Sequence, residues 1–239
     1  MIVAVLQARM SSTRLPGKVL ADVAGAPMVL RQVERLRRAA SIDRLIMATS
    51  NEASDDPLAR AVEAAGVEVF RGALNDVLGR FAGAVAGLAD EDLMLRLTAD
   101  CPLADPVLIE ALIARHKAGG VDYSATTLPH RTYPIGLDAE ILSAGLLRLM
   151  AREANDPYER EHVTPFVYRR PERFGLGGLT QDRDESQVRW TVDLPSDLAF
   201  VRAVYEALYP RKPAFTSGDI RALVRGRPDL AALGDLPRI

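Results

Sequence analysis

Short apolar runs alternate with longer amphipathic segments over the first half of the chain. The apolar runs lie at 2–6, 44–50, 67–72 and 93–98. The segments with apolar residues at helical spacing lie at about 27–40, 55–65, 76–88 and 106–118. Runs that are apolar throughout are typical of strands buried on both faces, and their alternation with helices favours a parallel sheet. The pattern predicts an α/β fold.

The second half of the chain is less regular. We expect a helix near 143–154, a strand around 188–192 and a last helix near 196–208, followed by a polar, Pro-rich tail. The region from about 130 to 185 reads as an excursion from the sheet that holds acceptor or dimer contacts. The whole chain, 1–239, is expected to form a single domain, since 48% apolar content allows a large core.

The balance of charges narrows the class of partners. Thirty Lys and Arg face 32 Asp and Glu, which gives a net charge of -2. No overall basic field therefore exists to hold nucleic acid or an anionic membrane, and any anion must be bound locally. The single Cys101 excludes an intramolecular disulfide, and no apolar stretch approaches the roughly 20 residues of a membrane span. We expect a cytoplasmic protein.

Three cations lie within ten residues directly after the first predicted strand: Arg9, Arg14 and Lys18. The same loop carries the hydroxyl side chains of Ser11, Ser12 and Thr13. Cations, hydroxyls and loop amides together suit a polyphosphate, although three cations alone are equally typical of a solvated loop. The loop is not a Walker A motif, because Ser12 and Val19 stand where that motif needs Gly and Ser or Thr.

Two carboxylates follow predicted strands, Asp100 in "TADCPL" and Asp193 in "VDLPS". Either one alone is more often a turn residue. Ligands of open α/β sheets bind outside the carboxyl ends of the strands, where both carboxylates would face the cationic loop. Mg²⁺ is commonly held by one or two carboxylates together with substrate phosphates. The set predicts metal-assisted attack on a nucleoside triphosphate.

Further candidates are weaker. Asp138 and Glu140 in "PIGLDAE" share one face if that segment is a strand. They would then be acceptor contacts, third metal ligands or exposed carboxylates on a half-buried strand. His162, beside Glu161, suits an acceptor or interface contact, but a structural histidine is the commoner role. Cys101 reads as a buried side chain.

Six ordered blocks resemble a known family: "LQARMSSTRLPGKVL", "FRGALNDVLGRF", "LTADCPLADP", "RTYPIGLDAE", "EREHVTPFVYRRPERF" and "VRWTVDLPSDLAFVRAVYE". They resemble the spore coat polysaccharide biosynthesis protein F-like cytidylyltransferases, grouped with the acylneuraminate and 3-deoxy-manno-octulosonate cytidylyltransferases. The resemblance implies a three-layer, GT-A-like, Rossmann-related fold with a mostly parallel sheet and a dimerisation excursion. It also implies CTP and Mg²⁺ as reactants, an acidic sugar or phosphorylated acceptor, surface polysaccharide biosynthesis and a homodimer.

By matching position, the resemblance places Arg9 and Lys18 on the triphosphate and Arg71 with Asp76 near the base. It places Asp100 and Asp193 on the metal. Arg9, Lys18 and Asp100 are the residues that we expect to be catalytic. The remaining nucleotide-binding positions that we expect are Gln7, Ala8, Ser12, Thr13 and Arg14. Ser11 and Ala99 stand where many relatives have Gly, and their side chains would narrow the nucleotide pocket.

The implied reaction is attack of an acceptor oxygen on the α-phosphorus of CTP, with pyrophosphate leaving roughly in line. Three alternatives stay open: a nucleotidyltransferase that uses another nucleoside triphosphate, a GT-A glycosyltransferase and a non-catalytic nucleotide-binding module. A glycosyltransferase would hold its metal on an Asp-x-Asp sequence and bind a diphosphate, whereas three cations suit a triphosphate. A module without catalysis would tolerate loss of the metal carboxylates, and both are present.

Overall fold

The computed structural model describes residues 1–233; residues 234–239, the end of the range expected to form one domain, lie outside it. Its centre is a seven-stranded sheet in the order β5-β4-β1-β6-β8-β7-β9. The strands are β1 (Ile2–Gln7), β4 (Arg44–Ser50), β5 (Glu68–Gly72), β6 (Leu93–Thr98), β7 (Tyr123–Ala125), β8 (Glu140–Ser143) and β9 (Leu176–Gly178). Strands β5, β4, β1 and β6 are parallel, and β8 runs antiparallel to β6 and β7.

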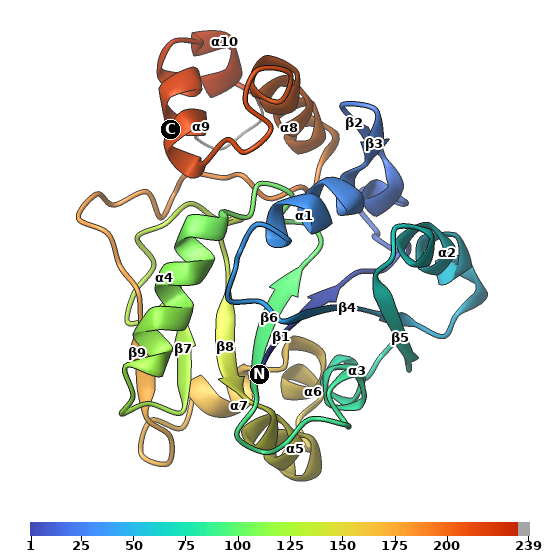
Figure 1. Cartoon of the computed structure of the whole chain (residues 1–239), viewed down its shortest axis with the longest axis vertical. Coiled ribbons are helices and arrows are strands. Elements are labelled where there is room, and N and C mark those ends of the chain that lie inside the picture. Colours follow the sequence, from blue (N-terminus) through green and yellow to red (C-terminus); the bar gives the residue numbers. More distant parts are fainter. Residues whose placement is uncertain (234–239) are drawn as a thin grey trace.

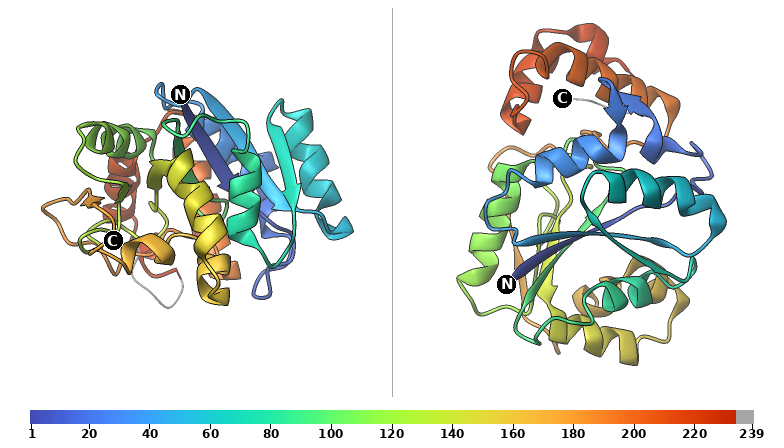
Figure 2. Two further views of the ribbon diagram at one scale, coloured as in Figure 1. Left: turned by 90° about the horizontal axis from the view of Figure 1, so that it is seen from below. Right: turned by 45° about the vertical axis from the view of Figure 1, so that its right-hand side comes forward.

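Ten helices are described: α1 (Met28–Leu36), α2 (Asp56–Ala64), α3 (Val77–Ala84), α4 (Pro106–Lys117), α5 (Ala144–Glu153), α6 (Pro157–His162), α7 (Pro165–Tyr168), α8 (Pro195–Leu208), α9 (Ser217–Arg225) and α10 (Pro228–Ala231). Helices α1, α2 and α4 cover one face of the sheet, and α3, α5, α6 and α7 cover the other (Figures 1 and 2). The predicted three-layer α/β arrangement is confirmed.

Strand β1 shows why the sheet is buried on both sides. Ile2, Ala4 and Leu6 pack against the layer of α1, α2 and α4, whereas Val3 and Val5 pack against the layer of α3 and α5. Alternate side chains point to opposite faces of a strand, so an entirely apolar strand can be covered on both. Helices α8, α9 and α10 build a third apolar cluster around Trp190 at one end of the molecule (Figure 1).

The expected elements of the second half need correction. The segment 188–192 forms no strand; it makes one bridge, between Ile135 and Arg189. Trp190 is buried there at 1% exposure, as core packing requires. The expected polar tail contains two further helices, α9 and α10, which bury Ile220, Val224 and Leu230.

The region 130–185 is largely part of the main fold. It contributes β8 and β9 to the sheet and helices α5, α6 and α7 to the layer below it. The cluster of apolar residues in this region, Val163, Phe166, Val167 and Tyr168, was the segment in which we expected a two-fold interface. Val163, Phe166 and Val167 are instead buried in the core of their own chain, and Tyr168 is 36% exposed. No described helix is long and apolar enough to cross a membrane.

Candidate active site

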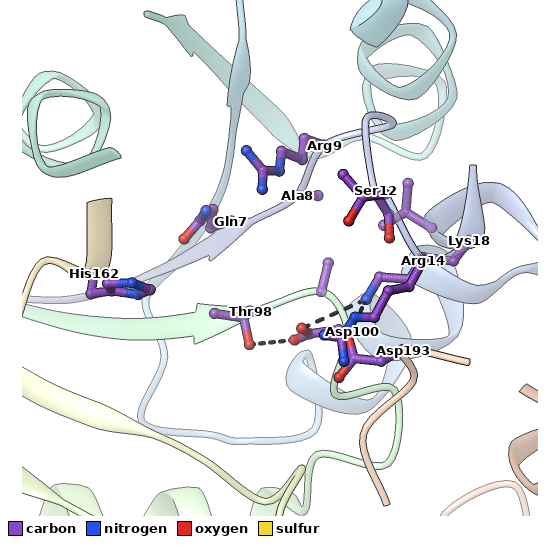
Figure 3. A pocket seen from close by; sticks show the side chains of 13 residues that line it. Gln7, Ala8, Arg9, Ser12, Arg14, Lys18, Thr98, Asp100, His162 and Asp193 are labelled. Carbon is purple, nitrogen blue, oxygen red and sulfur yellow. Dashed lines mark hydrogen bonds and ion pairs between the residues drawn. The ribbon is translucent and has the colours of Figure 1, made fainter. Parts of the chain in front are cut away.

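The loops after β1 and β6 open side by side because these strands are parallel neighbours, with Gln7 paired to Thr98. Between them lies a cavity of about 340 Å³, which we call the first cavity. Its lining comprises Gln7, Ala8, Arg9, Ser12, Thr13, Arg14, Lys18, Val19, Thr98, Ala99, Asp100, His162 and Asp193 (Figure 3). The structure thus brings together the expected nucleotide-binding residues of the first loop and both predicted metal carboxylates. Ala99 lines this cavity, whereas Ser11, also expected to narrow it, does not.

Buried Asp55 fixes the start of the first loop. Its carboxylate accepts hydrogen bonds from the Met10 amide at 2.7 Å and from the amide and hydroxyl of Ser50, as well as from the Thr49 hydroxyl. Burial alone would raise the pKa of Asp55, but these hydrogen bonds outweigh it and hold the pKa below its ordinary value. Sequence reasoning missed Asp55, which lies between β4 and α2.

Lys18 lies between the two carboxylates. Its Nζ donates to the Val192 carbonyl at 2.5 Å and to Asp193 Oδ1 at 3.0 Å, and it lies 3.8 Å from Asp100 Oδ2. The residue is only 8% exposed. The turn that leads to it bends at Gly17, whose φ of +71° is a conformation that favours glycine.

Asp193 is surrounded by positive charge. Arg14 lies 3.0 Å from Oδ1, and the Arg189 guanidinium donates to Oδ2 at 2.5 Å. Burial would raise the pKa of Asp193, but the Lys18 hydrogen bond and charge, with those of Arg189 and Arg14, lower it. The carboxylate is therefore ionised at neutral pH.

A positioning pair that sequence reasoning missed supports Asp193. Asp197, 1% exposed, accepts from the amides of Asp193 and Leu194 at 2.9 Å each and pairs with Arg189. This interaction caps the start of α8 and fixes the backbone of Asp193. The available signal was "LPSD", in which an acidic residue stands three positions after Leu194, the residue that precedes the Pro-initiated helix.

Asp100 is oriented from both sides. The Thr98 hydroxyl donates to Oδ1 at 2.6 Å (Figure 3). The main-chain carbonyl of Asp100 accepts hydrogen bonds from the Val192 amide at 2.7 Å and from the Thr191 hydroxyl. These bonds connect the end of β6 to the segment before Asp193. Burial raises the pKa of the adjacent Cys101 thiol well above its ordinary value, which disfavours a nucleophilic thiolate.

A second cavity of about 510 Å³ adjoins the first at Arg9, which lines both. Asp76 lies there, where it caps α3 through the Gly79 amide and pairs with Arg160 of α6 at 2.5 Å. Arg71, expected beside Asp76, lines neither cavity. Its guanidinium pairs with Asp56 at 2.7 Å and donates to the carbonyls after β4.

Asp138 and Glu140 line a third cavity, of about 360 Å³, that shares Thr98 with the first. Arg131 pairs with Asp138, and Arg96 pairs with Glu140 at 2.8 Å. Both carboxylates line the same cavity, but only Glu140 belongs to a strand, β8, and Asp138 precedes it.

His162, the last residue of α6, lines the first cavity on the side opposite Lys18 (Figure 3). Its ring lies 4.3 Å from the Tyr158 ring. The next residue, Val163, has a φ of +71°, and the Thr164 amide bonds back to the His162 carbonyl at 2.9 Å. This is a γ-turn of the rare, strained kind, and it turns the chain sharply beside the cavity.

Asp-x-Asp sequences occur twice in the chain, at 90–92 and 182–184, and neither contributes to these three cavities. Asp92 pairs with the amino group of Met1 at the other end of β6. Within residues 1–233, no group of three or more His, Cys, Asp or Glu could hold a metal by itself. A cation in the first cavity would need substrate oxygens besides Asp100 and Asp193.

Comparisons with known proteins identify the family. The chain is 32% identical over 237 residues to the spore coat polysaccharide biosynthesis protein SpsF of Bacillus subtilis, with 96% of each chain covered. It is 34% identical to the 3-deoxy-manno-octulosonate cytidylyltransferase of Yersinia pseudotuberculosis over 66% of this chain and 65% of the relative. A cytidylyltransferase structure from Leptospira borgpetersenii superposes with a TM-score of 0.89 at 28% identity, covering 96% and 95% of the two chains. The cytidylyltransferase family model matches residues 3–217, so the chain belongs to the cytidylyltransferase family.

Proposed function

We propose that this cytidylyltransferase moves the cytidylyl group of CTP to a small acidic sugar or phosphorylated acceptor. The observation that carries the proposal is the convergence of a cationic loop and two separate carboxylates on one cavity, with Lys18 in contact with both. The acceptor class is supported by the relative named for 3-deoxy-manno-octulosonate.

The first cavity suits the triphosphate. Arg9, Arg14 and Lys18 supply positive charge, and Ser12 and Thr13 supply hydroxyl donors. The second cavity, reached past Arg9, suits the base, with Asp76 at its wall. Arg71 does not line this cavity, and its guanidinium pairs with Asp56, so we assign it no contact with the base.

Asp100 and Asp193 are the residues that would hold Mg²⁺. Their oxygens are the donors that Mg²⁺ prefers, and the ion would supply charge neutralisation on the phosphates. The acceptor oxygen forms a bond to the α-phosphorus while the bond to the β-phosphate oxygen breaks, and pyrophosphate leaves with that electron pair. Arg9 and Lys18 stabilise the charge that builds on the leaving group.

A double-mutant cycle tests this assignment. If Asp100 and Asp193 hold the same ion, Asp100→Asn and Asp193→Asn each lower turnover severely, and the double variant is hardly worse than either. Turnover is measured as pyrophosphate release at several Mg²⁺ concentrations with all four nucleoside triphosphates. Asp105→Asn is the matched control, because buried Asp105 caps α4 and lies outside the first cavity. Near-normal turnover in either single variant would contradict the mechanism.

The homodimer, the cytoplasmic location and a role in surface polysaccharide biosynthesis are proposals too. The buried, free thiol of Cys101 is compatible with a reducing compartment.

A further inference from the structure

Asp100 belongs to a loop that is buried although it has no regular structure. Residues 98–104, from the end of β6 toward α4, form what we call the Asp100 segment, in which Cys101, Leu103 and Ala104 are at most 4% exposed. Loops usually run over the surface, because a buried loop needs partners for its backbone N–H and C=O groups away from water. The groups that serve as those partners decide how firmly Asp100 is held.

Helix α1 holds both ends of the Asp100 segment. Gln32 Nε2 donates to the Thr98 carbonyl at 3.0 Å, and Arg35 Nε donates to the Ala104 carbonyl at 2.7 Å. Gln32 and Arg35 are 0% and 1% exposed. They lie three positions apart and therefore share one face of the helix. That face is turned to the segment and not to solvent.

Helix α8 holds the middle of the segment. The Tyr205 hydroxyl donates to the Pro102 carbonyl at 3.0 Å, and Tyr205 is 1% exposed. The centre of the Tyr205 ring lies 5.1 Å from that of the Phe215 ring, and the Arg35 guanidinium lies 4.2 Å from the same Phe215 centre. The donors from α1 and α8 are thus packed into one buried cluster.

Stability alone does not account for these donors. Gln32 Oε1 and both Nη atoms of Arg35 are buried without a hydrogen-bond partner among the described residues. Burial lowers the pKa of Arg35, and the nearby Tyr205 and Asp105 offset this effect only in part. Buried polar groups without partners destabilise a fold, and apolar side chains of similar volume are often at least as stable in their place. What the donors do supply is a fixed position for carbonyls on both sides of Asp100.

The Asp100 carboxylate depends on this backbone more than the Asp193 carboxylate does. Asp193 has three cations within 3.0 Å. Asp100 accepts hydrogen bonds from the Thr98 hydroxyl at 2.6 Å and from the Cys101 thiol at 3.5 Å, and its cation, Lys18, is 3.8 Å away. Both of these donors belong to the Asp100 segment itself. The direction of the Asp100 carboxylate therefore follows the position of the segment.

We propose that Gln32, Arg35 and Tyr205 are positioning residues for the cytidylyl transfer, because they fix the Asp100 segment in the protein before nucleotide and Mg²⁺ bind. This inference rests on the proposed function, since it concerns how Asp100 is presented to the metal. None of the three residues lines the first cavity. They act through the carbonyls of the segment and touch neither the nucleotide nor the ion.

The test measures the affinity for CTP by calorimetry, with and without Mg²⁺. The ratio of the two dissociation constants is called the magnesium effect. Arg35→Met and Tyr205→Phe each remove a donor and keep a side chain of similar size. Loss of a residue that orients a metal ligand typically costs about 10- to 100-fold in metal affinity, so we expect the magnesium effect to fall about tenfold in each variant. CTP affinity without Mg²⁺ should not change.

Two further measurements separate positioning from general stability. Hydrogen exchange of the backbone amides of the Asp100 segment, in protein without metal, should be faster in Arg35→Met and Tyr205→Phe. The melting temperature of Arg35→Met should nevertheless stay close to that of the natural protein, because removal of a buried cation offsets the lost hydrogen bond. Arg35→Lys keeps a donor for the Ala104 carbonyl and should recover most of the magnesium effect.

Matched controls come from the same two helices. Arg31 of α1 also donates to two backbone carbonyls and lies over an aromatic ring, that of Tyr209, at 4.2 Å. The Tyr209 hydroxyl, directly after α8, donates to Glu34 at 2.9 Å. None of these groups belongs to a residue that lines the first cavity. Arg31→Met and Tyr209→Phe should therefore keep the full magnesium effect.

The outcomes distinguish this inference from the proposed function. An unchanged magnesium effect in Tyr205→Phe and in every Arg35 variant that folds would overturn the inference and leave the proposed function intact. So would an equal loss in the Arg31→Met and Tyr209→Phe controls, since the effect would then come from helix packing in general. A natural protein that binds CTP no better with Mg²⁺ than without it would contradict the metal assignment of the proposed function, and this inference with it.

Discussion

Lys18 has a structural role as well as its proposed chemical one. A loop lysine exposed to solvent would contribute little to stability, but the Lys18 ammonium is buried between Asp100, Asp193 and the Val192 carbonyl. It therefore joins the first loop to a segment about 175 residues away along the chain. Removal of one partner of a buried ion pair leaves an uncompensated charge.

Lys18→Ala should accordingly lower both turnover and stability. We expect turnover to fall by about 10²–10³, which is typical of removing one preorganised charge stabiliser. Thermal unfolding should also move to lower temperature, since the buried hydrogen bonds of the Lys18 ammonium to Asp193 and the Val192 carbonyl are lost. Lys212→Ala is the control, because its pair with Asp219 is exposed and remote from the first cavity. Full turnover of Lys18→Ala at saturating CTP would remove the leaving-group role.

Asp55 predicts a pH dependence of stability. Its pKa in the folded protein is below the ordinary 3.8, because hydrogen bonds from Ser50, Met10 and Thr49 outweigh the effect of burial. The ionised carboxylate thus stabilises the fold above about pH 4, and this contribution is lost as the pH falls through the folded-state pKa. Asp55→Asn should be less stable than the natural protein at pH 7, and the difference should shrink below pH 4. Denaturant unfolding across this range measures it; a difference independent of pH would contradict the assignment.

At the scale of elements, the cap of α8 connects stability to the site. Asp197→Ala removes the acceptor for the Asp193 and Leu194 amides and should cost about 1 kcal/mol of unfolding free energy. Because the hydrogen bond from the Asp193 amide to Asp197 also fixes the backbone of Asp193, turnover should fall as well. Asp219→Ala removes the equivalent cap of α9, at Thr216, and neither residue lines the first cavity. The Asp219→Ala variant should lose a similar amount of stability and keep normal turnover. Equal turnover in Asp197→Ala and Asp219→Ala would contradict a link between the cap of α8 and catalysis.

Sequence periodicity predicts helices that are buried on one face and strands that are buried on both faces. The strands 44–50 and 93–98 have the expected bounds, and α4 differs by one residue at its end. The segment 188–192 looked like a strand because Val188, Trp190 and Val192 alternate with polar residues, but its apolar side chains are buried by α8 and α9 rather than by strand neighbours. The pattern of apolar residues alone cannot distinguish these two kinds of burial.

The same limit applies to the site. Lys18, Asp100 and Asp193 were predictable because charged residues directly after buried segments stand out in the sequence. Asp55 and Arg189 were not, since each acts through contacts that only the fold creates. Arg71 lies in a sequence block that resembles the family, and we expected it near the base. In the structure its guanidinium pairs with Asp56 in the first turn of α2.

At the scale of the whole molecule, the homodimer stays a prediction. The apolar residues expected to form its interface are buried within one chain, which leaves Tyr158 and Tyr168 as the exposed aromatics of that region. We expect sedimentation at micromolar concentration to give twice the chain mass of 26.0 kDa. Tyr158→Ser together with Tyr168→Ser should weaken the association if these side chains contribute. A monomer at that concentration would contradict the prediction.

The contact between Lys18 and Asp193 also bears on how the protein is made. Ribosomes synthesise from the N-terminus, so β1 and the cationic loop emerge long before the segment that completes their charge balance. Until Asp193 and the Val192 carbonyl are available, the Lys18 ammonium has no partner on that side. A nascent chain, or any fragment that ends before residue 193, would therefore carry an open basic loop able to attract polyanions. Only the nearly finished polypeptide converts that loop into a closed, charge-compensated site.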